Sequence, residues 1–105
     1  MKLETTAPPQ TDIEFVVMDE TELEHPYRVI IHNDDVTPFD FVIAVLVHFF
    51  ELDARRAADI TVAAHISGQA LVTVLPYEEA HQRVYAAQSA ARDYGYPLSF
   101  TLEPE

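Results

Sequence analysis

The feature that most constrains the fold of this chain is a strand-like run that stops abruptly at three polar residues. Residues 27–32 read Tyr-Arg-Val-Ile-Ile-His, a β-branched and aromatic pattern typical of a strand. Asn33, Asp34 and Asp35 follow directly, and Asn and Asp are the residues that most often form tight turns. The sequence therefore predicts a buried strand that ends in a polar turn.

A helix is expected immediately after this turn. Thr37 stands at a suitable N-cap position, Pro38 suits the first helical residue, and Asp40 occupies a capping-box position three residues after the cap. Apolar residues then recur at spacings of three and four, which predicts one wide buried face. These residues are Phe41, Val42, Val45, Leu46, Phe49 and Phe50.

A second helix of about 14 residues is predicted between Asp53, as its N-cap, and Gly68, as its C-terminal stop. Five residues recur at helical spacing and are expected to share its inner face. They are Ala57, Ile60, Thr61, Ala64 and His65.

The rest of the chain predicts a strand, a helix and a strand. Residues 70–75 form the second strand, and Pro76 followed by the acidic Glu78 suits the start of a third helix, which ends at Gly95. Residues 98–102 alternate apolar and polar side chains as a third strand does. The order β-α-α-β-α-β predicts an α+β fold, a small open sandwich in which a three-stranded sheet packs against three helices.

Residues 1–26 differ from the rest in charge. They hold seven acidic residues and one lysine, a net charge of −6, which is half of the −12 carried by all 105 residues. We predict that 1–26 is a flexible acidic N-terminal arm and that 27–105 is the folded core domain. A solvated tail without a function is the alternative.

The overall charge and hydropathy narrow the classes of partner. A net charge of −12 repels polyphosphates, so nucleic acid is a poor partner, whereas cationic groups such as a protein's α-amino group are attracted. No apolar run reaches the roughly 20 residues that span a bilayer. We expect a soluble cytoplasmic protein, a monomer, with no membrane contact.

Three polar features are hard to explain by core packing: residues 33–35, Thr37 and His65, which lies on an otherwise apolar helical face. Each also has an ordinary structural explanation. Residues 33–35 could be only a turn, Thr37 only a cap, and His65 only a hydrogen-bonded core histidine. Residue types alone leave both alternatives open.

Catalysis and metal binding are disfavoured. His65 beside Asp34 or Asp35 would make a base with its orienting carboxylate, yet the chain has no Cys and no G-x-S-x-G nucleophile motif. His32 could join these residues around a divalent ion, but no known metal-ligand spacing supports that site. We expect a non-enzymatic protein without a metal or another cofactor.

Binding of an ammonium group beside an apolar side chain uses all of these residues. Asp34 can accept a charge-assisted hydrogen bond, Asn33 offers an amide oxygen, and a ring nitrogen of His65 can contact the ligand. Apolar and small residues would line the adjoining cavity. These are Phe39, Val42, Thr61 and Leu98.

Three motifs make the chain resemble the ClpS family, adaptors that deliver N-degron substrates to the Clp protease. They are YRVIIHNDDVTPFDFVIAVL at 27–46, AHISGQA at 64–70 and PLSFTLE at 97–103. The resemblance covers residues 27–105, with the motifs in order and at the family's spacing. It implies the ClpS fold, which is related to the C-terminal domain of the ribosomal stalk protein.

The same resemblance implies roles for individual residues. The α-amino group of a substrate that starts with Leu, Phe, Tyr or Trp would be held by Asn33, Asp34 and His65. The pocket for its side chain would be formed by Asp35, Thr37, Phe39, Val42, Thr61, Ala64 and Leu98. The N-terminal domain of a Clp AAA+ unfoldase would contact the chain near Glu78 and Arg83, and the acidic arm would take part in delivery.

Two positions depart from the family's pattern. Thr61 replaces a usual Met at the edge of the pocket, and Phe39 replaces another common Met. Thr61 is shorter and β-branched, and its hydroxyl needs a partner, while Phe39 could refill the space. The hypothesis is an altered first-residue preference that extends to Ile or Val. The alternative function is a regulator that blocks other substrates of the unfoldase without carrying N-degron cargo.

Overall fold

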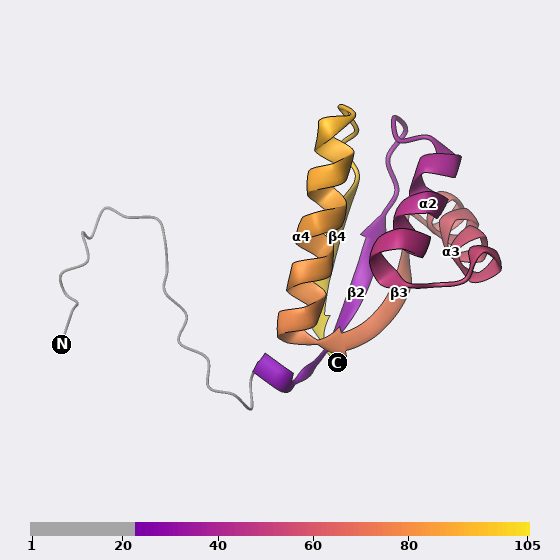
Figure 1. The fold of residues 1–105 in the computed structure, drawn as a ribbon. Helices are drawn as coiled ribbons and strands as arrows, with labels where there is room; N and C mark the ends of the chain where they lie inside the picture. Colours follow the sequence, from indigo (N-terminus) through magenta and orange to yellow (C-terminus); the bar gives the residue numbers. More distant parts are fainter. Residues whose placement is uncertain (1–22) are drawn as a thin grey trace, which may run out of the picture.

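The structure is a computed structural model, and it describes residues 23–105. It contains six elements in the predicted order β-α-α-β-α-β, as Figure 1 shows. The strands are β2 (Pro26–His32), β3 (Gln69–Pro76) and β4 (Ser99–Pro104), and the helices are α2 (Phe39–Phe50), α3 (Ala54–Ser67) and α4 (Tyr77–Asp93). The predicted α+β class, with one three-stranded sheet and three helices, is confirmed.

The sheet is antiparallel and has the strand order β3-β2-β4, so β2 is central. The register of β2 places its last residue, His32, opposite Gln69 of β3 and Ser99 of β4. A bulge between Val29 and Ile30 interrupts the pairing with β3. The last residue of β2 is therefore held from both sides, which fixes the direction in which the polar turn leaves the sheet.

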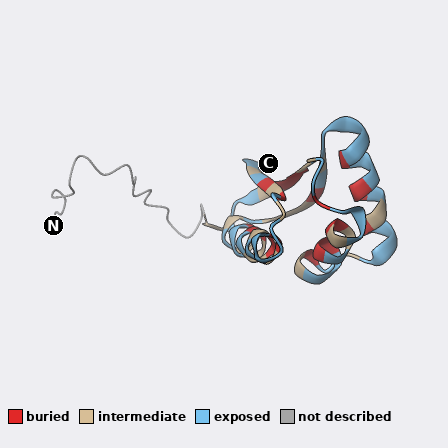
Figure 2. Ribbon diagram, turned by 90° about the horizontal axis from the view of Figure 1, so that it is seen from above, coloured by how far each residue is buried: buried red, intermediate tan, exposed pale blue. Residues whose placement is uncertain are grey.

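One face of the sheet carries the core. Val29 and Ile31 point to the same side of β2 and are almost fully buried against all three helices. Helix α4 packs across the three strands, α3 packs on β3, and α2 lies between the two other helices, as Figures 1 and 2 show. The buried side chains of α4 are small or medium in size, which allows this close approach. They are Ala80, Val84, Ala87 and Ala91.

Local signals predicted the ends of α3 correctly. The side chain of Asp53 accepts a hydrogen bond from the backbone N–H of Arg56 at 2.8 Å, as an N-cap does. Gly68 follows the last turn with a φ of 93°, a left-handed conformation that glycine adopts without a Cβ clash. Its N–H donates to the carbonyl oxygen of Ala64 at 2.8 Å.

The predicted start of α2 is wrong. The helix begins at Phe39, its N-cap is Pro38, and no side chain caps it. Thr37 lies one residue before the N-cap and does not accept from the first helical turn; its hydroxyl and its backbone N–H both donate to Asp34. The capping-box role expected for Asp40 fails with it, since that role depends on Thr37 as the cap.

Strand β2 begins at Pro26, one residue before the predicted start of the core domain. His25 and Pro26 are tied to the fold through their carbonyl oxygens, which accept from the N–H groups of Tyr77 and Glu105 at 3.1 and 3.0 Å. Residues 1–22 of the predicted acidic arm lie outside the described residues, so the arm stays a prediction. Within 23–105, no helix is long and apolar enough to cross a membrane.

Candidate functional site

The turn after β2 is organised by the carboxylate of Asp34. One oxygen accepts hydrogen bonds from the backbone N–H groups of Val36 at 2.8 Å and Thr37 at 2.7 Å. The other oxygen accepts from the Thr37 hydroxyl at 2.9 Å. Asp34 therefore closes an Asx-type turn, in which a side chain takes the place of a backbone acceptor.

The surroundings of Asp34 keep it ionised. Partial burial raises its pKa, but the hydrogen bonds from Thr37 and Val36 and the positive charge of Arg92 lower it by more, so the pKa lies below its ordinary value of 3.8. The site thus holds a fixed negative charge at neutral pH.

A backbone hydrogen bond joins this turn to the end of α3. The N–H of Asn33 donates to the carbonyl oxygen of Gly68 at 2.9 Å. The last turn of α3, which carries His65, therefore lies next to the polar turn. Asn33 and Gly68, which belong to different motifs and lie 35 residues apart in the sequence, meet here.

A pocket of about 290 Å³, its open mouth included, lies directly beside the turn. Its walls come from the end of β2, the following turn, α2, α3 and the residue before β4. Ten residues line it: Ile31, His32, Asn33, Asp34, Thr37, Phe39, Val42, Thr61, Ala64 and Leu98. Eight of the ten site residues that the sequence and the family resemblance indicated are among them.

The remaining two, Asp35 and His65, do not line the pocket. Both are exposed, so the prediction that His65 lies on the buried inner face of α3 is wrong. The His65 ring instead packs edge-on against the ring of Phe39, with centroids 5.1 Å apart and an interplanar angle of 76°. His65 therefore lies beside a pocket-lining residue rather than inside the pocket.

Two lining residues show how the departures from the family pattern are accommodated. Thr61 is only 4% exposed, and its hydroxyl donates to the carbonyl oxygen of Ala57 at 2.8 Å, so the expected partner lies within its own helix. Phe39 also lines the pocket and is 44% exposed, so only part of its ring is covered, and the expectation that it refills the space beside Thr61 stays a prediction. The pocket keeps an apolar interior with an aromatic ring at its rim.

Ile31 and His32 line the pocket although the sequence did not place them in it. The sequence placed both residues in the first strand, and His32 was considered in addition only as a metal ligand. The available signal was their position, because residues that immediately precede a functional turn border the same space. A ring nitrogen of His32 lies 2.8 Å from the hydroxyl of Thr101 on β4.

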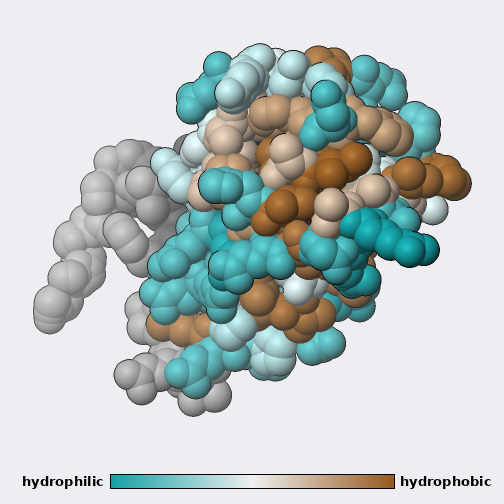
Figure 3. Space-filling view, turned by 45° about the vertical axis from the view of Figure 1, so that its right-hand side comes forward, coloured by the Kyte–Doolittle hydropathy of each residue, from teal (hydrophilic) through white to brown (hydrophobic). Residues whose placement is uncertain are grey.

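The site has the chemistry of a binding pocket. An ionised carboxylate and an amide lie at one end of an apolar cavity, an arrangement that suits a cation attached to an apolar group. In the part of the chain from 23 to 105, no three His, Asp or Glu side chains cluster as metal ligands. Figure 3 shows apolar surface gathered at the centre of one face, with hydrophilic side chains around it.

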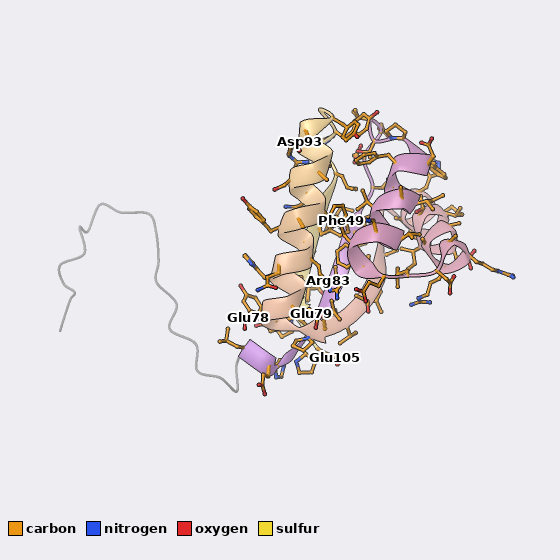
Figure 4. All side chains as sticks on the ribbon, in the orientation of Figure 1. Phe49, Glu78, Glu79, Arg83, Asp93 and Glu105 are labelled. Atoms are coloured by element: carbon orange, nitrogen blue, oxygen red, sulfur yellow. The ribbon has the colours of Figure 1, made fainter. Side chains whose placement is uncertain are left out.

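The second predicted contact region lies at the start of α4. The Arg83 guanidinium donates to the carbonyl oxygen of Phe49 at 2.9 Å and to Glu79 at 3.0 Å, and it lies 3.5 Å from Glu51. Figure 4 shows Arg83 between α4 and α2, with Glu78 on the other side of the first turn of α4. Arg83 thus joins α4 to the C-terminal end of α2, while Glu78 is exposed.

The chain is also similar to known proteins. Residues 22–101 match the family described as ATP-dependent Clp protease adaptor protein ClpS. The ClpS 2 adapter protein of Mesorhizobium japonicum is 38% identical over 102 residues, covering 97% of each chain. The ClpS adapter protein of Shewanella loihica is 43% identical over 86 residues, covering 80% of this chain and 84% of that protein.

A solved structure is similar as well. The structure of Agrobacterium tumefaciens ClpS2 bound to L-phenylalaninamide superposes with a TM-score of 0.75 at 34% sequence identity. The match covers 78% of this chain and 99% of that one.

Proposed function

The chain belongs to the ClpS family of ATP-dependent Clp protease adaptors, and from this premise we propose that it binds proteins with destabilising N-terminal residues and delivers them to a Clp unfoldase–protease. The favoured first residues are Leu, Phe, Tyr and Trp. The protein acts as a non-enzymatic adaptor, and a monomeric state and a cytoplasmic location remain predictions.

The observation that carries this proposal is the ionised carboxylate of Asp34 at the edge of an apolar pocket. An N-terminal Phe or Leu presents the matching pair, a cationic α-amino group and an apolar side chain on the same carbon atom. L-phenylalaninamide, the ligand of the Agrobacterium relative, has both groups. An internal Phe lacks the amino group, so the pocket distinguishes a chain end from a chain interior.

Asp34 has the capacity for this contact. A carboxylate offers about four lone-pair sites, and three donors from Val36 and Thr37 occupy part of them. The same three bonds hold the carboxylate in place before a ligand arrives, so little ordering is needed on binding. We assign the α-amino contacts to Asn33, Asp34 and His65, with His65 acting from the rim.

The substrate side chain enters the cavity beyond the carboxylate. The walls assigned to it are Thr37, Phe39, Val42, Thr61, Ala64 and Leu98. Asp35 has an indirect role, because it belongs to the turn but not to the pocket lining. Burying a Phe or Leu side chain contributes about 1.5–3 kcal/mol, and a charge-assisted hydrogen bond contributes a similar amount. Association entropy offsets part of this sum, so micromolar affinity for a short peptide is expected.

The first-residue preference is proposed to extend to Ile and Val. Thr61 is short and its hydroxyl is satisfied by Ala57, so a β-branched ligand meets no unpaired polar group on that wall. The unfoldase contact is proposed near Glu78, with Arg83 supporting this region through its bonds to α2.

The test compares fluorescence anisotropy of a labelled Phe-initiated peptide with that of its N-acetylated counterpart. Micromolar binding that acetylation abolishes is the expected result. Equal binding of the two peptides would sink the adaptor proposal. If neither peptide binds and the chain still inhibits degradation of other substrates by the unfoldase, the regulator alternative is correct.

A further inference from the structure

The segment between α4 and β4 forms one wall of the pocket without regular secondary structure of its own. Residues 96–98 belong to no helix or strand, and β4 begins only at Ser99. Leu98 nevertheless is 1% exposed and lines the pocket. Because no strand pairing fixes the backbone at Leu98, other contacts must hold it.

Two side chains on one face of α4 provide these contacts. One terminal nitrogen of Arg92 donates to the carbonyl oxygen of Tyr96 at 2.7 Å and to that of Leu98 at 2.9 Å. Gln88, one helical turn earlier, accepts from the N–H of Phe100 at 2.8 Å. The backbone on both sides of Leu98 is therefore anchored to α4.

We propose that Arg92, assisted by Gln88, is a positioning residue that holds Leu98 in the pocket wall and so sets the affinity for the first side chain of the substrate. This inference rests on the proposed function. Arg92 does not line the pocket, so its effect on the ligand passes through Leu98. The planar guanidinium suits the task, because it directs its N–H groups at fixed angles toward two carbonyl oxygens.

The positive charge of Arg92 is expected to weaken ligand binding, whereas its hydrogen bonds to the backbone around Leu98 are expected to strengthen it. Its positive charge acts on Asp34 and would repel an ammonium ligand beside that carboxylate. Removal of the charge alone would therefore tighten binding, whereas loss of the anchor weakens it. The two roles predict changes of opposite sign, so weaker binding by Arg92→Gln would show that loss of the anchor outweighs loss of the charge.

The experiment measures binding of the labelled Phe-initiated peptide to the full chain and to Arg92→Lys, Arg92→Gln and Gln88→Met. Arg28→Gln serves as the matched control, since it removes the same charge from a residue outside the pocket lining whose partner is Glu103 at 3.9 Å. Circular dichroism melts verify that each variant is folded at the temperature of the assay. We expect Arg92→Gln to weaken binding about tenfold, Arg92→Lys to weaken it less, and Arg28→Gln to leave it unchanged.

A double-mutant cycle with Leu98→Ala tests whether Arg92 acts through Leu98. If it does, Arg92→Gln weakens binding much less in the Leu98→Ala background than in the original chain. Equal losses in both backgrounds, or unchanged or tighter binding by Arg92→Gln alone, would overturn the inference and leave the proposed function intact. If the original chain fails to bind the peptide, the proposed function falls, and this inference falls with it.

Discussion

Replacement of Asp34 by Asn separates the turn-forming hydrogen bonds of this carboxylate from its proposed contact with the α-amino group of the ligand. Asn keeps one side-chain oxygen that can accept from the N–H groups of Val36 and Thr37, and its amide can donate to the Thr37 hydroxyl. The turn should therefore persist in Asp34→Asn, while the negative charge is lost. Asp34→Ala removes both the charge and the acceptors.

The expected magnitudes follow from these three bonds. Exchanging charged for neutral hydrogen bonds should cost Asp34→Asn about 1 kcal/mol of unfolding free energy, since charge-assisted bonds are roughly twice as strong. Asp34→Ala should cost about 2–4 kcal/mol, because the N–H of part-buried Thr37 loses its acceptor. For the ligand, both variants lose the contact with the ammonium group, about 1.5–3 kcal/mol, or roughly 10- to 150-fold in affinity.

Urea denaturation gives the stabilities, and anisotropy with the Phe-initiated peptide gives the affinities under conditions where each variant is folded. Asp59→Asn is the matched control, because Asp59 is an exposed carboxylate on α3 outside the pocket lining, and its variant should bind within about threefold of the original chain. Unchanged affinity of Asp34→Asn would refute the assignment of the amino group to Asp34. A stability loss equal to that of Asp34→Ala would refute the account of the turn.

Three further predictions concern pH, residue preference and the unfoldase contact. The folded-state pKa of Asp34 lies below its ordinary value, so the stability that this group contributes is complete above about pH 4 and is lost as the pH falls through the folded pKa. The difference between the urea midpoints near pH 6 and pH 3 should therefore be larger for the original chain than for Asp34→Asn. Thr61→Val keeps the β-branched shape and loses only the hydrogen bond to Ala57, so it should retain the first-residue preference of the original chain. Thr61→Met should no longer bind peptides that begin with Ile or Val. A peptide array in which the original chain already fails to bind Ile- and Val-initiated peptides would contradict this prediction. Glu78→Lys should weaken binding to the unfoldase N-terminal domain without changing the melting temperature. Arg83→Met should weaken this binding too and should also cost about 1–3 kcal/mol of unfolding free energy, because it breaks the hydrogen bond to the carbonyl oxygen of Phe49 in α2. Equal stability of the two variants would show that this hydrogen bond contributes nothing.

Most of the fold could be predicted from the sequence because its signals are local. Asp53 and Gly68 each act through backbone groups within four residues, so both ends of α3 were predicted correctly. Thr37 failed as a cap because the helix begins one residue later than predicted and the Thr37 side chain is directed to the carboxylate of Asp34, three residues earlier. A propensity for capping does not show which neighbouring acceptor a threonine will meet.

The site was less accessible to sequence reasoning, for two reasons. His65 follows the last buried residue of α3, so helical spacing placed it with the inner face although it lies at the edge of that stripe and is exposed. Arg92 and Gln88 form hydrogen bonds with backbone groups, which every residue type has, so the partner residues cannot be recognised from the sequence. The residues of the pocket walls could be predicted from the family motifs, whereas the hydrogen bonds that anchor Leu98 could be identified only in the structure.

The pocket walls come from both ends of the folded part of the chain, since Ile31 and Leu98 line the same cavity. Local fraying that releases either one would abolish the site, so a bound ligand should oppose unfolding of the domain as a whole. By thermodynamic linkage, a ligand at 100 times its dissociation constant adds about 2.7 kcal/mol to the unfolding free energy. An adaptor loaded with cargo should therefore be measurably harder to denature than an empty one, and its melting temperature becomes a label-free measure of cargo occupancy.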